Sequence, residues 1–347
     1  MAIEEEKLIF IISQPRAGST LLQRILGKHS QIHTVAEPWI MLNPVFALPG
    51  KGNKSDSATD KKALKLFLQE LPNGQEDFFE GIRLMYKYLY AQALKPSGKS
   101  YFLDKTPRYY YIIKELYSIF PRAKFIILLR NPVAVLNSII KTWVRGDWFL
   151  LGKYYRDDLI KAPYCLASGK RELKEKVYTL HYETLIAEPE KVVGQLCEYI
   201  GINFEYQMLD FAQGSLKQFK LGDPQNIYQN KTVNSSNLGG WIDDIKTFPQ
   251  VWHFCKEYLG FLRENNLLSE LGYSYKEIDK TFNENCPKSF NFKIPLSWAL
   301  NKQNNVKPFT QEALFRKYFY KRRSMEDLIS KKGYSQTFLY LLKKSFL

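Results

Sequence analysis

Residues 7–20 of the chain read KLIFIISQPRAGST, and the ten residues that follow read LLQRILGKHS. The opening apolar run, rich in β-branched residues, predicts a buried strand over 7–13. Residues 14–20 are of the types that form turns and helix caps, and the apolar residues after them recur at helical spacing. The segment therefore predicts a strand, a loop and a helix in immediate succession.

The same alternation continues along the chain. Further strands are expected in KSYFLDKTP, ending at Asp104-Lys105, in AKFIILLRNP, ending at Arg130, and in KVYTLHYETL. Helical patterns lie between and after the strands, at about 60–71, 77–94, 108–119, 132–143 and 189–201. Strands with near-continuous apolar runs that alternate with helices predict an α/β fold, in which helices flank both faces of a P-loop-like parallel sheet.

The composition excludes several protein classes. The chain has 347 residues, of which 45% are hydrophobic and 24% charged, as in an ordinary globular protein. No window reaches the ~18 consecutive apolar residues of a membrane span. The start, MAIEEEKLIFIIS, places three acids before a short apolar run, whereas a secretory signal has a basic start and a longer apolar stretch, so we expect a cytoplasmic protein. The 4 cysteines form no CxxC pair, and we expect reduced thiols without a zinc site.

The charge distribution points to anionic partners. Lys and Arg number 50 and Asp and Glu 35, giving a net charge of +15. Residues 301–347 alone hold eleven basic and three acidic residues, or +8. We therefore predict a domain over 1–275 and a basic, mainly helical C-terminal extension over 276–347. The extension either packs on the domain, contacts a membrane surface or captures an acidic polymer. No DNA- or RNA-binding motif occurs, so a nucleic-acid partner is not expected.

The loop after the first strand has the features of a phosphate site. Its backbone N–H groups and the dipole of the following helix favour an anion there. Arg16, Ser19 and Thr20 add side-chain donors around Gly18, although a capped strand-to-helix turn is the alternative interpretation. The loop is not an ATPase P-loop, because no Lys follows Gly18 and the strand at 124–130 ends in Arg130 where a magnesium-binding Asp is expected.

Polar clusters follow all four predicted strands. Because parallel strands end at the same edge of a sheet, one pocket can collect these clusters. They are the residues 16–20, 104–105, 130–131 and 181–183.

At this point the sequence resembles the sulfotransferases that use 3′-phosphoadenosine 5′-phosphosulfate (PAPS). In that family a PRSGTT-like loop holds the 5′-phosphosulfate, which implies this role for Arg16, Ala17, Gly18, Ser19 and Thr20. A later strand that ends in Arg, with Ser eight positions on, holds the 3′-phosphate. Residues 130 and 138 have the required types and spacing (138 − 130 = 8), so the resemblance assigns the 3′-phosphate to Arg130 and Ser138.

Further matches are closest to the protein-tyrosine sulfotransferases. The resemblance implies Glu37 as the general base, Lys105 as a catalytic cation, Tyr182 near the adenine and Lys231 in a loop (221–231) that covers the nucleotide. One departure is that Pro107 stands where cytosolic sulfotransferases have a catalytic His. His33 is nearby, and we expect it to be structural.

The resemblance implies in-line transfer without a metal, with Glu37 taking the acceptor proton while Lys105 and Arg16 stabilise the charge. Pro38 follows Glu37 and breaks the acidic element of the tyrosine enzymes, so a carbohydrate, glycolipid or metabolite hydroxyl is favoured over a peptide tyrosine. Asp104 either orients Lys105 or caps a turn. Two rivals stay open: a P-loop small-molecule kinase, and a non-catalytic protein that binds anions or a membrane surface.

Overall fold

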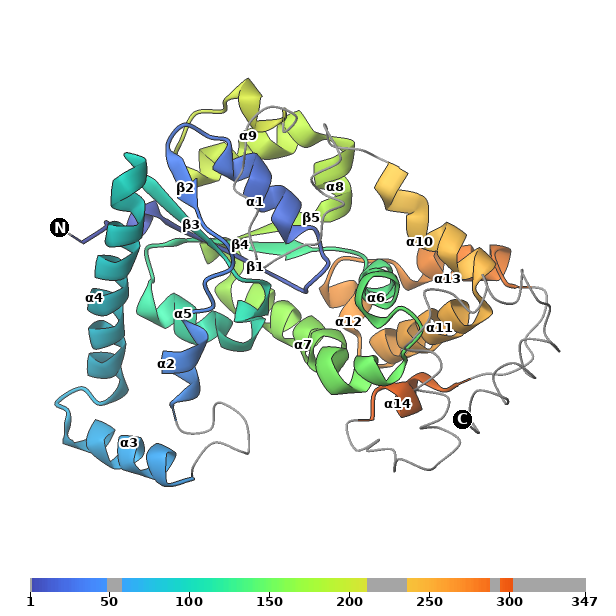
Figure 1. The fold of residues 1–347 in the computed structure, drawn as a ribbon, viewed down its shortest axis with the longest axis horizontal. Coiled ribbons are helices and arrows are strands. Elements are labelled where there is room, and N and C mark those ends of the chain that lie inside the picture. The colour runs from blue at the N-terminus through green and yellow to red at the C-terminus, as the bar shows by residue number, and fades with distance from the viewer. Residues whose placement is uncertain (1, 49–57, 211–235, 288–293, 302–347) are drawn as a thin grey trace, which may run out of the picture.

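A computed structural model describes residues 2–48, 58–210, 236–287 and 294–301. Its centre is a sheet of five parallel strands in the order β2-β3-β1-β4-β5 (Figure 1). The strands are β1 (Leu8–Ser13), β2 (Ile32–Thr34), β3 (Tyr101–Lys105), β4 (Lys124–Leu129) and β5 (Val177–His181). The predicted α/β fold with a parallel sheet is confirmed.

The strand order explains where a ligand can enter. The chain leaves β1 toward β2 and β3 on one side, and β4 and β5 then add on the other side. Ligands of open α/β sheets bind at such a switch point, beyond the carboxyl ends of the strands. The loop 14–18 follows the carboxyl end of β1 and occupies this position.

Alternating side chains of the strands build two cores. Ile9 and Ile11 of β1 face one core, which is covered by α1 (Ser19–Gly27), α8 (Tyr182–Ala187) and α9 (Pro189–Ile200). Phe10 and Ile12 face the other core. The helices that cover that core include α4 (Gln75–Leu94), α5 (Ile113–Ile119), α6 (Pro132–Ile139) and α7 (Arg156–Leu173). Helices therefore flank both faces, as the continuous apolar strands require (Figure 1).

The later helices extend the second core. They are α10 (Ser236–Thr247), α11 (Pro249–Glu264), α12 (Leu267–Glu270), α13 (Tyr275–Glu284) and α14 (Leu296–Ala299). Phe282 of α13 and Leu296 of α14 are buried in the same cluster as the sheet. The boundary at 275/276 stays a prediction, and residues 302–347 of the basic extension lie outside the described residues.

Several elements differ from the sequence-based expectation. β2 and the short helix α2 (Leu42–Phe46) were not predicted, because three to five residues are too few to show a period. The expected helix at 108–119 is a 3-10 helix, η3 (Pro107–Ile112), followed by α5. The helix from Pro132 continues beyond α6 as a π-helix, η4 (Ile140–Val144). The patterns at 60–71 and 77–94 correspond to α3 (Ala58–Glu70) and α4.

Candidate active site

The loop between β1 and α1 exposes backbone donors at the start of a helix. Gly18 precedes α1 with φ 98° and ψ 12°, and no side chain caps the helix N-terminus. A Cβ on Gly18 would lie 2.6 Å from Cε2 of the Tyr182 ring, so only glycine fits there. Ser19 is buried at the first helical position and Thr20 follows it half-buried. This geometry suits an anion such as a phosphate or sulfate.

The Arg16 guanidinium is held by α6 and by η4, the π-helix that continues it. Arg16 Nε donates to Ser138 Oγ at 3.2 Å, and Nη2 donates to Thr142 Oγ1 at 3.3 Å. The guanidinium carbon also lies 5.3 Å from the centre of the Trp143 ring. The structure thus brings together Arg16 and Ser138, to which the resemblance gave different phosphates. Thr142 was missed, although its position one helical turn after Ser138 was a usable signal.

Arg130 and Tyr182 close the other side of the loop. Arg130 Nη1 donates to the Arg16 carbonyl at 2.9 Å, and its guanidinium lies 4.5 Å from the centre of the Tyr182 ring. The same ring packs against Gly18. The loop 14–18, the end of β4 and the start of α8 therefore meet in one place, as the strand-end clusters predicted.

Asn131 and Glu183 fix these strand ends to each other. The Asn131 side chain caps α6 by accepting from the Val133 N–H at 3.0 Å, which fits the Asn-Pro start of that helix. Glu183 Oε1 accepts from the Asn131 N–H at 2.9 Å, and its Oε2 accepts from the Tyr273 hydroxyl at 2.9 Å. This hydrogen-bond network holds Arg130 next to the loop.

Glu37 and Lys105 form an ion pair beside the start of α1. Lys105 Nζ lies 2.6 Å from Glu37 Oε1 and 3.3 Å from Thr20 Oγ1. The lysine side chain is 1% exposed and the glutamate side chain 14%. The pair joins the predicted base, the predicted catalytic cation and the phosphate loop, although the three segments are far apart in sequence. The individual roles stay predictions.

Asp104 does not contact Lys105 through its side chain, because consecutive strand residues point to opposite faces. Its Oδ2 accepts from the Tyr90 hydroxyl at 2.7 Å and the Tyr109 hydroxyl at 3.0 Å, and its Oδ1 accepts from Thr106 Oγ1 at 2.9 Å. Complete burial raises the pKa of Asp104 to about 6, against the opposing effect of these hydrogen bonds. Asp104 thus organises the second core below the site.

The other predicted features lie outside the described residues. These are Lys231, the loop 221–231 around it, and residues 302–347 of the extension. Within the residues that the structure describes, no group of three or more His, Cys, Asp or Glu side chains is placed to hold a metal ion. None of the described helices is both long enough and apolar enough to cross a bilayer. Metal independence stays a prediction.

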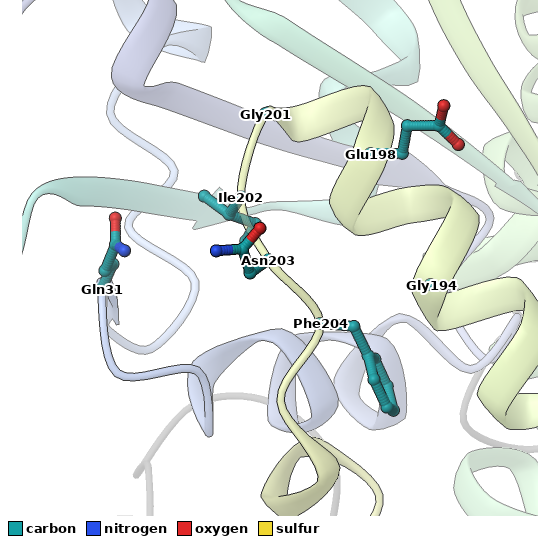
Figure 2. A pocket seen from close by; sticks show the side chains of 7 residues that line it. All are labelled: Gln31, Gly194, Glu198, Gly201, Ile202, Asn203 and Phe204. Carbon is teal, nitrogen blue, oxygen red and sulfur yellow. The ribbon is translucent and has the colours of Figure 1, made fainter.

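A separate hollow lies near the amino ends of the strands, opposite to the candidate active site. Figure 2 shows it between α9 with the segment that follows and Gln31, which precedes β2. It has a volume of about 460 Å³, and the Gln31 carbonyl accepts from the N–H of Tyr101 at the start of β3 (2.9 Å). Among the residues that the structure describes, the predicted site residues gather around the carboxyl ends of the strands, and none of these lines the hollow.

Comparisons with known proteins point to one family. A family model described as "Sulfotransferase family" matches residues 9–206, more than half of the chain. Nodulation protein NoeE of Sinorhizobium fredii (strain NBRC 101917 / NGR234) is 34% identical over 296 residues, which cover 77% of this chain and 66% of the relative. Protein-tyrosine sulfotransferase 1 of Danio rerio is 27% identical over 248 residues, which cover 69% of this chain and 66% of the relative.

Among solved structures, the sulfotransferase domain from the curacin biosynthetic pathway is similar, with a TM-score of 0.47 and 22% identity. The match covers 67% of this chain and 89% of that domain. The chain spans just under two thirds of the length of the two relatives above. On the family match over 9–206, the chain belongs to the sulfotransferase family of enzymes.

Proposed function

We propose that the chain transfers the sulfuryl group of PAPS to an acceptor hydroxyl. One observation carries the proposal: buried Lys105 contacts both Glu37 (2.6 Å) and Thr20 of the phosphate loop (3.3 Å). A cation between an anion-binding loop and a carboxylate suits a reaction in which negative charge moves toward the loop while a proton moves to the carboxylate.

In this proposal each side chain has a defined task. The N–H groups at the start of α1, with Ser19 and Thr20, bind the 5′-phosphate that leaves. Arg16 and Lys105 stabilise the sulfuryl oxygens as charge spreads over them. Glu37 accepts the proton of the acceptor hydroxyl as that oxygen bonds to sulfur and the bond from sulfur to the 5′-phosphate oxygen breaks. General-base help of this kind contributes roughly 10²–10⁴ in rate.

Recognition of the 3′-phosphate is proposed for Arg130 and Ser138. Arg130 Nη1 donates to the Arg16 carbonyl, and a guanidinium carries further donors that suit a phosphate. Ser138 shares the Arg16 guanidinium with Thr142 and is half-buried, within reach of the same region. A cation after β4 also argues against the rival kinase, which needs a magnesium-binding Asp there.

The acceptor is proposed to be a carbohydrate, glycolipid or metabolite hydroxyl rather than a peptide tyrosine. Half-buried Trp39 and Trp143 near Glu37 and Arg16 suit a ring-shaped acceptor, and Pro38 interrupts the acidic element of the tyrosine enzymes. We likewise propose a cytoplasmic location. Contact between the basic residues 301–347 and a membrane surface is also proposed, on the strength of their charge alone.

The test is transfer of 35S from labelled PAPS to a panel of acceptors in the presence of a chelator. The panel contains oligosaccharides, a glycolipid and a tyrosine peptide. We expect labelled product with wild type and a large loss in Glu37→Gln and Lys105→Met. Magnesium-dependent transfer of 32P from labelled ATP, with no transfer from PAPS, would establish the kinase instead.

A further inference from the structure

Both oxygens of the Glu37 carboxylate have a hydrogen-bond donor. Oε1 is bound by Lys105 Nζ at 2.6 Å, and Oε2 accepts from the indole Nε1–H of Trp39 at 3.1 Å. Lys105 ends β3, whereas Trp39 lies in the segment before α2. The plane of the carboxylate is therefore fixed from two independent directions.

The backbone around Trp39 is held in an unusual conformation. Trp39 has φ 58°, a left-handed value that a bulky residue adopts only when its surroundings impose it. The next two residues are pinned: the Ile40 carbonyl accepts from the Tyr86 hydroxyl at 3.0 Å, and the Met41 N–H donates to the Tyr109 hydroxyl at 3.2 Å. These bonds impose the turn that aims the indole at Glu37.

An ion pair between half-buried Arg108 and buried Asp158 braces the indole ring itself. The Arg108 guanidinium carbon lies 5.5 Å from the centre of the Trp39 ring. Arg108 binds Asp158 through two bonds, Nε to Oδ1 at 2.9 Å and Nη2 to Oδ2 at 2.6 Å. Asp158 is 1% exposed and also accepts from the Tyr110 hydroxyl at 2.7 Å. The ring thus packs against a cation that α7 anchors in the protein interior.

An indole is suited to orienting a base. The indole N–H only donates, so it can hold a carboxylate oxygen but cannot compete with Glu37 for the acceptor's proton. The indole is also neutral, so it adds no second positive charge beside Lys105. We propose that Trp39 is the positioning residue for Glu37, and that Arg108 and Asp158 hold it in place. This inference rests on the proposed function of Glu37 as general base.

The kinetic test is Trp39→Phe, which keeps an aromatic ring and removes only the donor. Turnover is measured as 35S-sulfate released from labelled PAPS with water as the acceptor, where Glu37 takes the proton of water. We expect kcat to fall about 10- to 100-fold, as for the loss of one hydrogen bond to a charged group, with KM for PAPS within about twofold of wild type.

Two further variants separate positioning from packing. If Trp39 acts through Glu37, Trp39→Phe causes no additional loss in a Glu37→Gln background. The matched control is Trp252→Phe, because the Trp252 indole also donates a hydrogen bond, to the Phe282 carbonyl at 3.2 Å, far from the base in the fold. We expect the control to turn over as wild type does.

Indole N–H resonances of 15N-labelled protein supply a readout without turnover. The chain has 6 tryptophans, and the Trp39 signal is assigned by its loss in Trp39→Phe. We expect this signal to shift in Glu37→Gln while the Trp252 signal stays in place. Wild-type turnover in Glu37→Gln would refute the proposed base and this inference together. A dead Glu37→Gln beside an unchanged kcat in Trp39→Phe, or an unmoved Trp39 resonance, would overturn the positioning role alone.

Discussion

Replacing Gly18 by alanine perturbs the phosphate loop at its tightest point. Two independent costs arise. The residue has φ 98°, where an L side chain is strained, and the added Cβ would lie 2.6 Å from Cε2 of Tyr182 and closer still to Cδ2. The ring cannot simply retreat, because Tyr182 is 6% exposed and the Arg130 guanidinium lies over it at 4.5 Å.

The two costs can be sized separately. A non-glycine residue in a sparsely populated positive-φ region costs about 1–3 kcal/mol. Forcing extra volume into a packed site costs about 1–3 kcal/mol more. Gly18→Ala should therefore lower the free energy of unfolding by about 2–6 kcal/mol, or displace the loop and lose affinity for the nucleotide instead. Tyr182→Ala in the same chain removes the overlap and leaves the φ cost.

Urea unfolding and calorimetric titration with 3′-phosphoadenosine 5′-phosphate (PAP) measure the two effects. Gly194→Ala is the matched control, because Gly194 lies on α9 with no atom within 4 Å of an added Cβ. This control should be neutral or slightly stabilising. Wild-type stability and affinity in Gly18→Ala, or no recovery when Tyr182 is also truncated, would refute the argument.

Three further predictions follow from buried charges. Burial raises the pKa of Asp104 from 3.8 to about 6, so between these pH values the folded protein keeps a proton that the unfolded chain has released. The resulting stabilisation of about 3 kcal/mol is complete below about pH 4 and is lost as pH rises through about 6. Asp104→Asn should abolish this dependence in denaturation measured from pH 4 to 7. Arg108→Met strands buried Asp158 and should cost about 3–5 kcal/mol of stability, and a chain as stable as wild type in urea would contradict the assignment. Lys105→Met should cut transfer by about 10²–10³ while PAP binding changes far less, and equal losses in both would show that Lys105 acts in binding alone.

Much of the fold could be predicted because its strands are strongly patterned. The runs at 8–13 and 124–129 are almost wholly apolar, and this pattern is typical of strands in a sheet that is buried on both faces. The edge strand β2 has three residues and carries no detectable period. The long helix α7 contains Pro163, a residue that ordinarily ends a helical pattern.

In the candidate site, too, some residues could be predicted from the sequence and others could not. The loop 16–20 and Arg130 were predictable because their spacing is local and their residue types suit phosphate. The support around Glu37 was not predictable, since Trp39, Arg108 and Asp158 meet only through tertiary packing and no period or spacing links them. Asp158 in particular reads as an ordinary acid in the first turn of a helix, yet it is buried against Arg108.

The central claim is that the chain binds a nucleotide with a 3′-phosphate. Its most direct measurement is calorimetric titration with PAP in the presence of a chelator, with 5′-AMP and magnesium-ATP as comparisons. Arg130→Ala runs beside wild type, and Arg122→Ala, at a 64% exposed side chain, serves as the surface control. We expect metal-free binding that requires the 3′-phosphate and weakens at least about tenfold in Arg130→Ala only. Equal affinity for 5′-AMP, or preferred binding of magnesium-ATP, would contradict the account.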